Sequence, residues 1–312
     1  MVMRWKRGSR LKLVNEAEAP APVQRIFDEV RRALGSPVVP KLYQAYAAFP
    51  AFLELHWDAF RPVMESRQFV LLGARLAAET YTRAHNYFAV RPMVARDAQR
   101  RAPGSLPVSQ VLDYYQYLDP LLLLIATAQM RALEAPIGQG PAKLDAAQHP
   151  DFPIAPRLLG DAEAPAKVHR IWEERAQMLS LAFVSDEHRA LAAWPSFYEE
   201  YWSLLKELLQ SPLYADCQSR IVESAWSLVR ELPARIEIDI AQLLDAGMND
   251  EELSSLVSTN EAFVQALSGL VLDVTFARIA FEGGSRSEPR RSHKAPAAGT
   301  RRKKASSPTR AA

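Results

Sequence analysis

A serine and an aspartate, Ser185-Asp186, stand at the start of an apolar helical segment predicted over 186–193. A carboxylate that lines an apolar pocket at a helix start can take a proton from water and let the hydroxide attack a carbon atom. The same two residues also fit a structural role, in which Ser185 caps the helix and Asp186 is satisfied by backbone N–H groups and the helix dipole. The residues alone leave both interpretations open.

The stretch around Asp186 has a counterpart 145 residues upstream. Residues 17–81 and 162–226 align at this fixed offset without a gap, with 20 identities in 65 positions. An Ala-Ala-aromatic-Pro motif is kept in both copies, whereas Lys41 stands where the second copy has Asp186. This pattern indicates an internal duplication, and two copies predict a pseudo-twofold arrangement rather than a solenoid.

Helical periodicity and abundant Ala, Leu, Arg and Glu dominate the chain, and no convincing period-2 pattern of a strand is present. The predicted fold is therefore all-α, with two homologous helical repeats packed as one pseudo-twofold body. Pro and Gly residues and shifts in composition mark the expected boundaries. These are a basic mobile leader (1–16), a first repeat (17–135), a Pro/Gly-rich linker (136–161), a second repeat (162–282) and a disordered basic tail (283–312).

Each half is predicted to have a break before its last long helix. In the first half, a helix near 108–117 is followed by a new one that opens at Asp119-Pro120, because Asp caps well and Pro suits a first turn. In the second half, a capped helix at 250–257 is followed by another from Asn260 to Phe281, with Thr259-Asn260 as its N-cap signal.

Composition excludes several classes of protein. The single cysteine, Cys217, rules out an internal disulfide and a cysteine-cluster metal site. The six histidines show no metal-binding spacing, and His188 is expected to be exposed rather than catalytic. A Gly-rich phosphate loop and a nucleophile elbow are both absent from the sequence. No secretory signal is recognisable, and no apolar run reaches the roughly 18–20 residues of a membrane span, so we predict a cytoplasmic protein without a membrane contact.

Charge is distributed unevenly. From residue 283 onward there are nine Lys or Arg and one acid, so the tail carries 9 − 1 = +8 and the remaining chain 2 − 8 = −6. Such a tail fits either an arm that binds nucleic acid or another anionic surface, or a solvated extension with only weak affinity for polyanions. The oligomeric state stays open, since a pseudo-twofold body can replace a dimer or sit within one.

The helical repeat layout, the Ala-Ala-aromatic-Pro pair and Ser185-Asp186 resemble the group I 2-haloacid dehalogenases over residues 17–282. The resemblance implies an all-α enzyme of two homologous halves that hydrolyses short 2-haloalkanoic acids without a cofactor or metal. It also implies that Asp186 activates a water, which displaces the halide at Cα in one step, with inversion and without an ester intermediate. The implied partners are a small 2-haloacid and water.

Several positions around the expected pocket depart from the family pattern. Asp119 stands where the family has a water-orienting Asn, and Val38 and Lys41 stand where it has aromatic walls. The Lys41 ammonium can pair with a substrate carboxylate or with Asp119, and the Tyr117 ring can contribute to an apolar niche for the halide. The expected site is Asp186 as catalytic base, with Ser185, Lys41, Asp119, Val38 and Tyr117 as substrate-binding residues.

Two other functions remain possible from the sequence. One is a non-catalytic member of the same fold that binds a small carboxylate or a protein partner. The other places function in the basic tail, as polyanion binding. The enzyme hypothesis requires Asp186 to lie in a pocket between the halves with room for a water, whereas tail binding predicts strong dependence on salt.

Overall fold

The computed structural model describes residues 11–93, 106–140, 144–152, 154–179 and 183–287. Within these ranges the regular structure is helical, apart from two isolated bridges that pair Ser66 with Ala146 and Ile137 with Ile236. The prediction of an all-α fold is therefore confirmed. The α-helices are α1 (Ala21–Leu34), α2 (Lys41–Tyr46), α3 (Pro50–Met64), α4 (Arg67–Tyr87), α5 (Val108–Glu134), α6 (Ala166–Leu179), α7 (Asp186–Leu191), α8 (Pro195–Leu209), α9 (Pro212–Leu228), α10 (Ile240–Asp245) and α11 (Asp250–Ser287).

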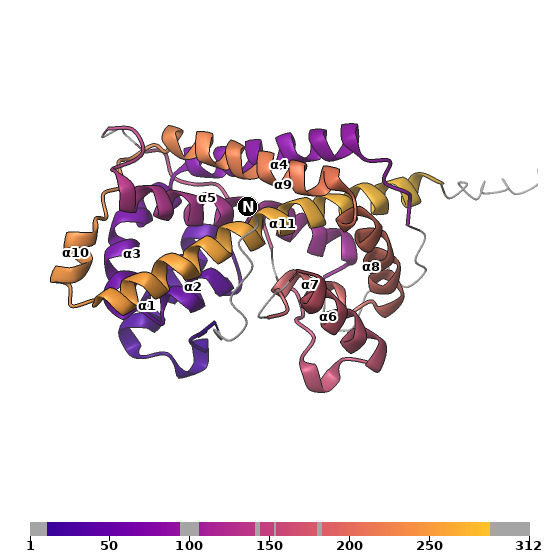
Figure 1. Cartoon of the computed structure of the whole chain (residues 1–312), viewed down its shortest axis with the longest axis horizontal. Coiled ribbons are helices and arrows are strands. Elements are labelled where there is room, and N and C mark those ends of the chain that lie inside the picture. The colour runs from indigo at the N-terminus through magenta and orange to yellow at the C-terminus, as the bar shows by residue number, and fades with distance from the viewer. Residues whose placement is uncertain (1–10, 94–105, 141–143, 153, 180–182, 288–312) are drawn as a thin grey trace, which may run out of the picture.

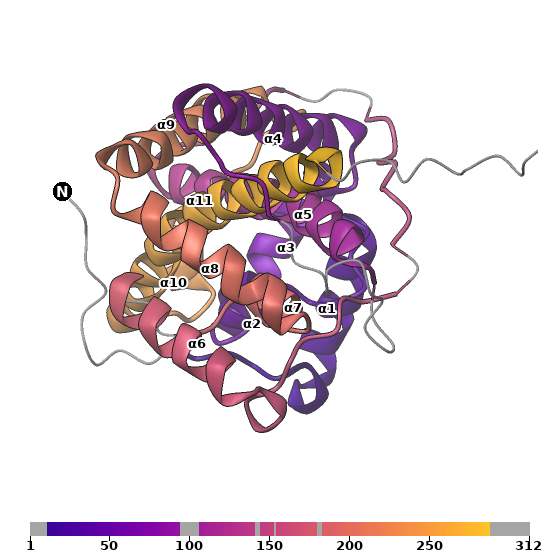
Figure 2. The ribbon, with the colours of Figure 1, turned by 90° about the vertical axis from the view of Figure 1, so that its right-hand side faces the viewer.

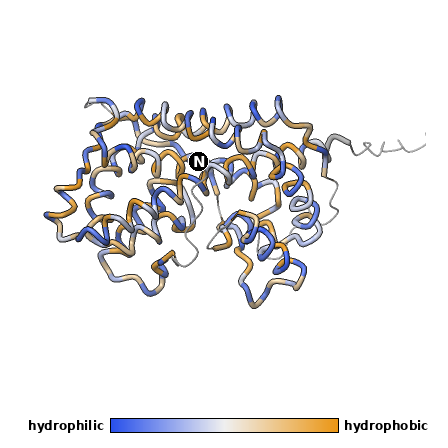
Figure 3. Tube along the Cα trace, viewed as in Figure 1, coloured by the Kyte–Doolittle hydropathy of each residue, from blue (hydrophilic) through white to orange (hydrophobic). Residues whose placement is uncertain are grey.

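The two longest helices, α5 and α11, pack along each other and cross the middle of the molecule (Figure 1). Helices α1–α3 and α10 lie to one side of them, and α6–α8 lie to the other. Helices α4 and α9 run side by side over the central pair, as the turned view shows (Figure 2). The outer helices mix hydrophobic and hydrophilic residues along their length (Figure 3), which is typical of helices with one face on a core.

Helix bounds in the two halves repeat at one spacing. Helices α6, α7, α8 and α9 each begin 145 residues after α1, α2, α3 and α4, and the first three pairs have equal lengths. A buried contact repeats as well, because the indole N–H of Trp57 donates to Glu29 and that of Trp202 donates to Glu174. Both contacts join residues 28 positions apart, so α1 is linked to α3 in the first half as α6 is linked to α8 in the second.

The predicted breaks before the last long helices are wrong, because α5 and α11 are both continuous. Pro120 lies inside α5, where it removes one backbone N–H donor, and Asn260 lies inside α11. Asn260 is fully buried and does not cap; its amide donates to the Ala126 carbonyl at 2.8 Å and accepts from the Tyr46 hydroxyl. Burial of long apolar faces outweighs these local breaker signals, because each broken helix would leave unpaired backbone groups in the core.

Both chain ends of the described body extend beyond their expected boundaries. Residues 11–14 fall within the predicted leader, yet the Val14 N–H donates to the Gln44 carbonyl at 2.9 Å, and Leu11 and Leu13 pack on the core. At the other end, α11 continues to Ser287, past the expected start of the tail. Residues 1–10 of the leader and 288–312 of the tail, which include most of the proposed polyanion arm, lie outside the described residues.

Helix α11 is, within the described ranges, long and apolar enough to cross a membrane, contrary to the expectation that no such segment exists. Residues 250–283 contain an 18-residue window with a mean hydropathy of 1.5, but 67% of that window is buried inside the protein. A central core helix passes the same test of length and composition. The hydropathy of α11 is thus accounted for by its packing against α5.

Close packing between α4 and α5 depends on Gly73. A Cβ atom at this position would lie 2.3 Å from Cδ2 of Leu121. We expect Gly73→Ala to destabilise the protein by about 1–2 kcal/mol, because overpacking exceeds the gain in helix propensity. Urea unfolding of this variant beside Gly140→Ala, where no atom lies within 4 Å of the new Cβ, measures the effect. Equal stability of the two variants would contradict the prediction.

Candidate active site

Asp186 and Lys41 form an ion pair, in which Lys41 Nζ donates to Asp186 Oδ1. They are the first residues of α7 and α2, and their side chains are 14% and 18% exposed. The two positions correspond at the 145-residue spacing, so equivalent points of the two halves meet in the structure. The structure pairs Lys41 with the expected base, Asp186, and the pairing of Lys41 with a substrate carboxylate stays a prediction.

Ser185 precedes α7 in an extended conformation, but its hydroxyl does not cap the helix. Its Oγ is buried without a hydrogen-bond partner, so the capping role considered from the sequence is wrong for the side chain. A buried hydroxyl without a partner costs about 1–3 kcal/mol, and such groups in native proteins usually contact water or a ligand. Ser185 is therefore available to a bound molecule beside Asp186.

Asp119 lies inside α5, which packs against α7. The side chain is buried, and its Oδ2 atom has no hydrogen-bond partner. Burial raises the pKa of Asp119 well above its ordinary value, and the negative charges of Asp186 and Asp273 raise it further. One turn earlier on α5, the Tyr115 hydroxyl is also buried without a partner, and burial followed by the charge of Asp186 raises its pKa. One face of α5 thus turns two unsatisfied polar groups towards α7.

Tyr117 and Val38 form hydrogen bonds with residues other than Asp186. The Tyr117 hydroxyl donates to the Leu34 carbonyl at 2.9 Å and lies 2.7 Å from Nδ1 of His149. Val38 is half-buried just before α2, where its carbonyl accepts a 2.7 Å hydrogen bond from Ser36. Their assignment to the substrate pocket stays a prediction.

Two neighbours of Asp186 on α7 are buried polar residues that sequence reasoning missed. His188, expected to be exposed, is fully buried, and its Nδ1 lies 2.9 Å from the Tyr198 hydroxyl. Burial, and then the charge of Arg175, lowers its pKa. Both carboxylate oxygens of Glu187 are buried without a hydrogen-bond partner of normal geometry. Burial raises the pKa of Glu187, and the charge of Asp119 raises it further.

A buried cation, Arg175 on α6, faces these acids. Its Nη2 lies 4.0 Å from Oδ2 of Asp273 on α11, and the other carboxylate oxygen of Asp273, Oδ1, accepts a 2.6 Å hydrogen bond from the Tyr214 hydroxyl. Burial raises the pKa of Asp273 to about 6, against the opposing charge of Arg175. A sequence signal for Arg175 existed, because it falls on the apolar stripe of its helix formed by Val168, Ile171 and Trp172.

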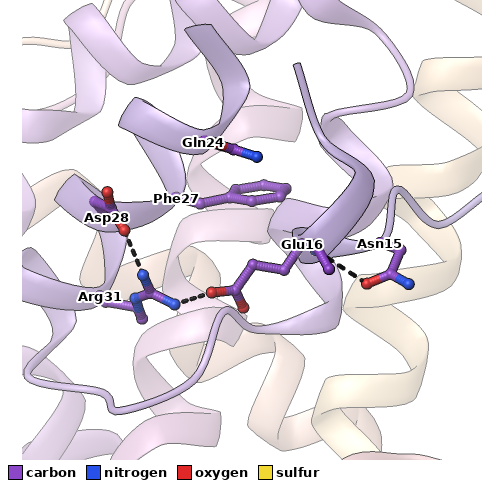
Figure 4. Close-up of a pocket in the computed structure, with 7 residues that line it drawn as sticks. Asn15, Glu16, Gln24, Phe27, Asp28 and Arg31 are labelled. Atoms are coloured by element: carbon purple, nitrogen blue, oxygen red, sulfur yellow. Dashed lines mark hydrogen bonds and ion pairs between the residues drawn. The ribbon is translucent and has the colours of Figure 1, made fainter. Parts of the chain in front are cut away.

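Elsewhere, a surface hollow between the first residues of the described chain and α1 contains none of the expected site residues (Figure 4). There Arg31 forms ion pairs with Glu16 and Asp28. Across the described ranges, no group of three or more His, Cys, Asp and Glu side chains is arranged to hold a metal ion. The residues around Asp186 are therefore the strongest candidate site that the described ranges contain.

Comparison with known proteins connects this geometry to a family. The family model described as halocarboxylic acid dehydrogenase DehI matches residues 37–187, a segment that contains all six expected site residues. An (R)-2-haloacid dehalogenase of Pseudomonas putida is 26% identical over 275 residues, which cover 85% of this chain and 91% of that relative. Over most of its length the chain is a distant homologue of the group I 2-haloacid dehalogenases.

Further members of the family extend the similarity. An (R)-2-haloacid dehalogenase of Rhizobium sp. (strain NHG3) is 23% identical over 238 residues, covering 74% of this chain and 92% of the relative. The solved structure of a D-2-haloacid dehalogenase in complex with L-LA has a TM-score of 0.77 and 25% identity, and covers 89% of this chain and 98% of its own. A mutant of a D-2-haloacid dehalogenase in complex with D-2-CPA has the same TM-score of 0.77. The family fold thus spans almost all of the described body.

Proposed function

We propose that this protein hydrolyses short 2-haloalkanoic acids, with Asp186 as the base that activates the attacking water. The observation that carries the proposal is the Lys41–Asp186 ion pair at a site matched by the family model. It supplies a carboxylate for the water and, beside it, a cation for the substrate carboxylate. The relatives named above as 2-haloacid dehalogenases support this choice of substrate class.

The reaction needs no covalent intermediate. Water donates one proton to the Asp186 carboxylate while its oxygen forms a bond to Cα of the substrate. The C–halogen bond breaks on the opposite side, its electron pair leaves with the halide, and the configuration at Cα is inverted. The products are a 2-hydroxy acid and a halide ion, and the proton then leaves Asp186 to solvent.

Lys41 has two partners in this scheme. In the free protein it neutralises Asp186. When the substrate enters, its carboxylate competes for the Lys41 ammonium, and the exchange releases Asp186 Oδ1 to accept a proton from water. The buried, unpartnered hydroxyl of Ser185 supplies a second donor for the substrate carboxylate.

The proposal includes a pseudo-twofold relation between two homologous halves. It is supported by the constant spacing of 145 residues between helices of the two halves and by the direct contact of the equivalent residues Lys41 and Asp186. Two residues at equivalent positions meet where a twofold axis passes between them. The cytoplasmic location inferred from the sequence belongs to the same proposal.

The test is halide release from the separate enantiomers of 2-chloropropionate and 2-bromopropionate. We expect release from at least one enantiomer and a hydroxy acid of inverted configuration. In a single turnover with excess enzyme in heavy-oxygen water, direct attack places the heavy isotope in the product hydroxyl. Ordinary oxygen in that hydroxyl would show an ester on the enzyme and contradict the mechanism; no release from any substrate would favour a non-catalytic carboxylate binder.

A further inference from the structure

Around Asp186, the carboxyl groups outnumber the positively charged side chains. Within mutual electrostatic reach lie four carboxyl groups and two cations, the cations being Lys41 and Arg175. Lys41 pairs with Asp186, and Arg175 lies closest to Asp273. Of the other two buried carboxyl groups, Asp119 has no cation acting on it, and the charge of Arg175 only partly offsets the effect of burial on Glu187. Since an isolated buried carboxylate costs several kcal/mol, both are expected to hold a proton.

Binding of the substrate also favours a neutral Asp119. The substrate is itself an anion, and an ionised Asp119 would add a second negative charge beside Asp186 where the substrate carboxylate must bind. A neutral Asp119 removes that repulsion. It also turns an acceptor-only group into one with an acceptor, the C=O, and a donor, the O–H.

We infer that Asp119 takes part in the reaction as a neutral carboxylic acid, whose C=O accepts a hydrogen bond from the attacking water and whose O–H donates to the substrate carboxylate. This inference rests on the proposed function. The Asp119 proton stays in place throughout, while the proton lost by water goes to Asp186. Asp119 is thus a substrate- and water-contacting residue distinct from the base.

Geometry and charge agree on this assignment. Asp119 Oδ2 is buried and unpartnered on the face of α5 that also carries the unpartnered Tyr115 hydroxyl. The charges that act on Asp119 come from Asp186 on α7 and Asp273 on α11. All of these groups are acidic, so their fields and burial both favour the neutral form of Asp119.

The first test compares kcat/KM for 2-chloropropionate across pH in the wild type and in Asp119→Asn. An amide has an acceptor and a donor, as the neutral acid does, but no titrating proton, so this variant isolates the effect of ionisation at position 119. In the wild type, kcat/KM should fall about tenfold per pH unit as the pH rises through the raised pKa of Asp119 and the group ionises. In Asp119→Asn this fall should be absent, because an amide does not titrate.

Three further variants complete the comparison. Asp119→Leu keeps the volume but removes donor and acceptor, and should lose about 100-fold in kcat/KM. Asp113→Asn makes the same chemical change on an exposed part of α5 and should keep the wild-type profile. Glu187→Gln removes the other buried acid with a raised pKa and should keep the wild-type fall in kcat/KM. A fall that persists in Asp119→Asn, or disappears only in Glu187→Gln, would overturn the inference.

A measurement without turnover separates this inference from the proposed function. Infrared difference spectra of wild type minus Asp119→Asn at neutral pH should contain the C=O band of a protonated carboxylic acid. A carboxylate band in its place overturns the neutral Asp119 whether or not halide is released. A protonated band together with no halide release would refute the dehalogenase proposal and leave the protonation state established.

Discussion

Asp186→Asn is expected to reduce halide release by about 10³- to 10⁴-fold, which is the upper range for loss of a general base. The amide that replaces the carboxylate is nearly the same in shape, and its oxygen still accepts a hydrogen bond from Lys41. It cannot take the proton of the attacking water. The loss should therefore appear in kcat, measured by halide release under saturating 2-bromopropionate, with little change in KM.

Stability separates this result from simple unfolding. Asp186 and Lys41 are both partly exposed, and such pairs contribute no more than about 1 kcal/mol. Thermal unfolding of Asp186→Asn should thus stay close to that of the wild type. A folded Asp186→Asn protein with wild-type turnover would remove Asp186 from the mechanism and direct attention to Glu187 or Asp119.

Arg175→Val is expected to destabilise the protein by about 3–5 kcal/mol at pH 8, because it breaks a buried ion pair and leaves acids without a cation. The first half supplies the reason for choosing Val, since the position equivalent to Arg175 is the fully buried Val30. Volume and apolar packing are thus not the expected cause of the loss. Denaturant unfolding of the variant beside the wild type measures it.

The loss in Arg175→Val should shrink as the pH is lowered. Asp273 has a raised pKa of about 6 while Arg175 is present, and removal of that positive charge raises it further. The folded variant therefore binds a proton more tightly than the unfolded chain, so its stability rises relative to wild type as pH falls from 8 towards 5. A deficit that is independent of pH would contradict this origin.

A double variant supplies the control. Arg175→Val combined with Glu187→Leu copies the residues of the first half, Val30 and Leu42, and removes one buried acid along with the cation. It should recover part of the stability lost in Arg175→Val. Arg25→Val, in an exposed pair with Glu29, should cost less than about 1 kcal/mol. A cost at Arg25 equal to that at Arg175 would mean that burial is not the cause.

The sequence by itself determined the helical class, the family and the spacing of 145 residues at which helix starts recur. Helical periodicity, Pro at helix starts and a left-handed Gly35 at the end of α1 are local signals, readable over a few turns of chain. The same alignment placed Lys41 opposite Asp186. It could not show that they touch, because contact between equivalent residues depends on how the two halves pack.

The tertiary structure decided what is buried around Asp186. Helix α7 has only six residues, too few for a periodic pattern to reveal that Glu187 and His188 both face inward. The tertiary structure also decided that α5 and α11 run unbroken through Pro120 and Asn260, although the local sequence predicts breaks there. In both cases the physical reason is the same: surrounding helices exclude water, and the cost of unpaired polar groups in that dry interior exceeds local conformational preferences and sets which groups carry protons.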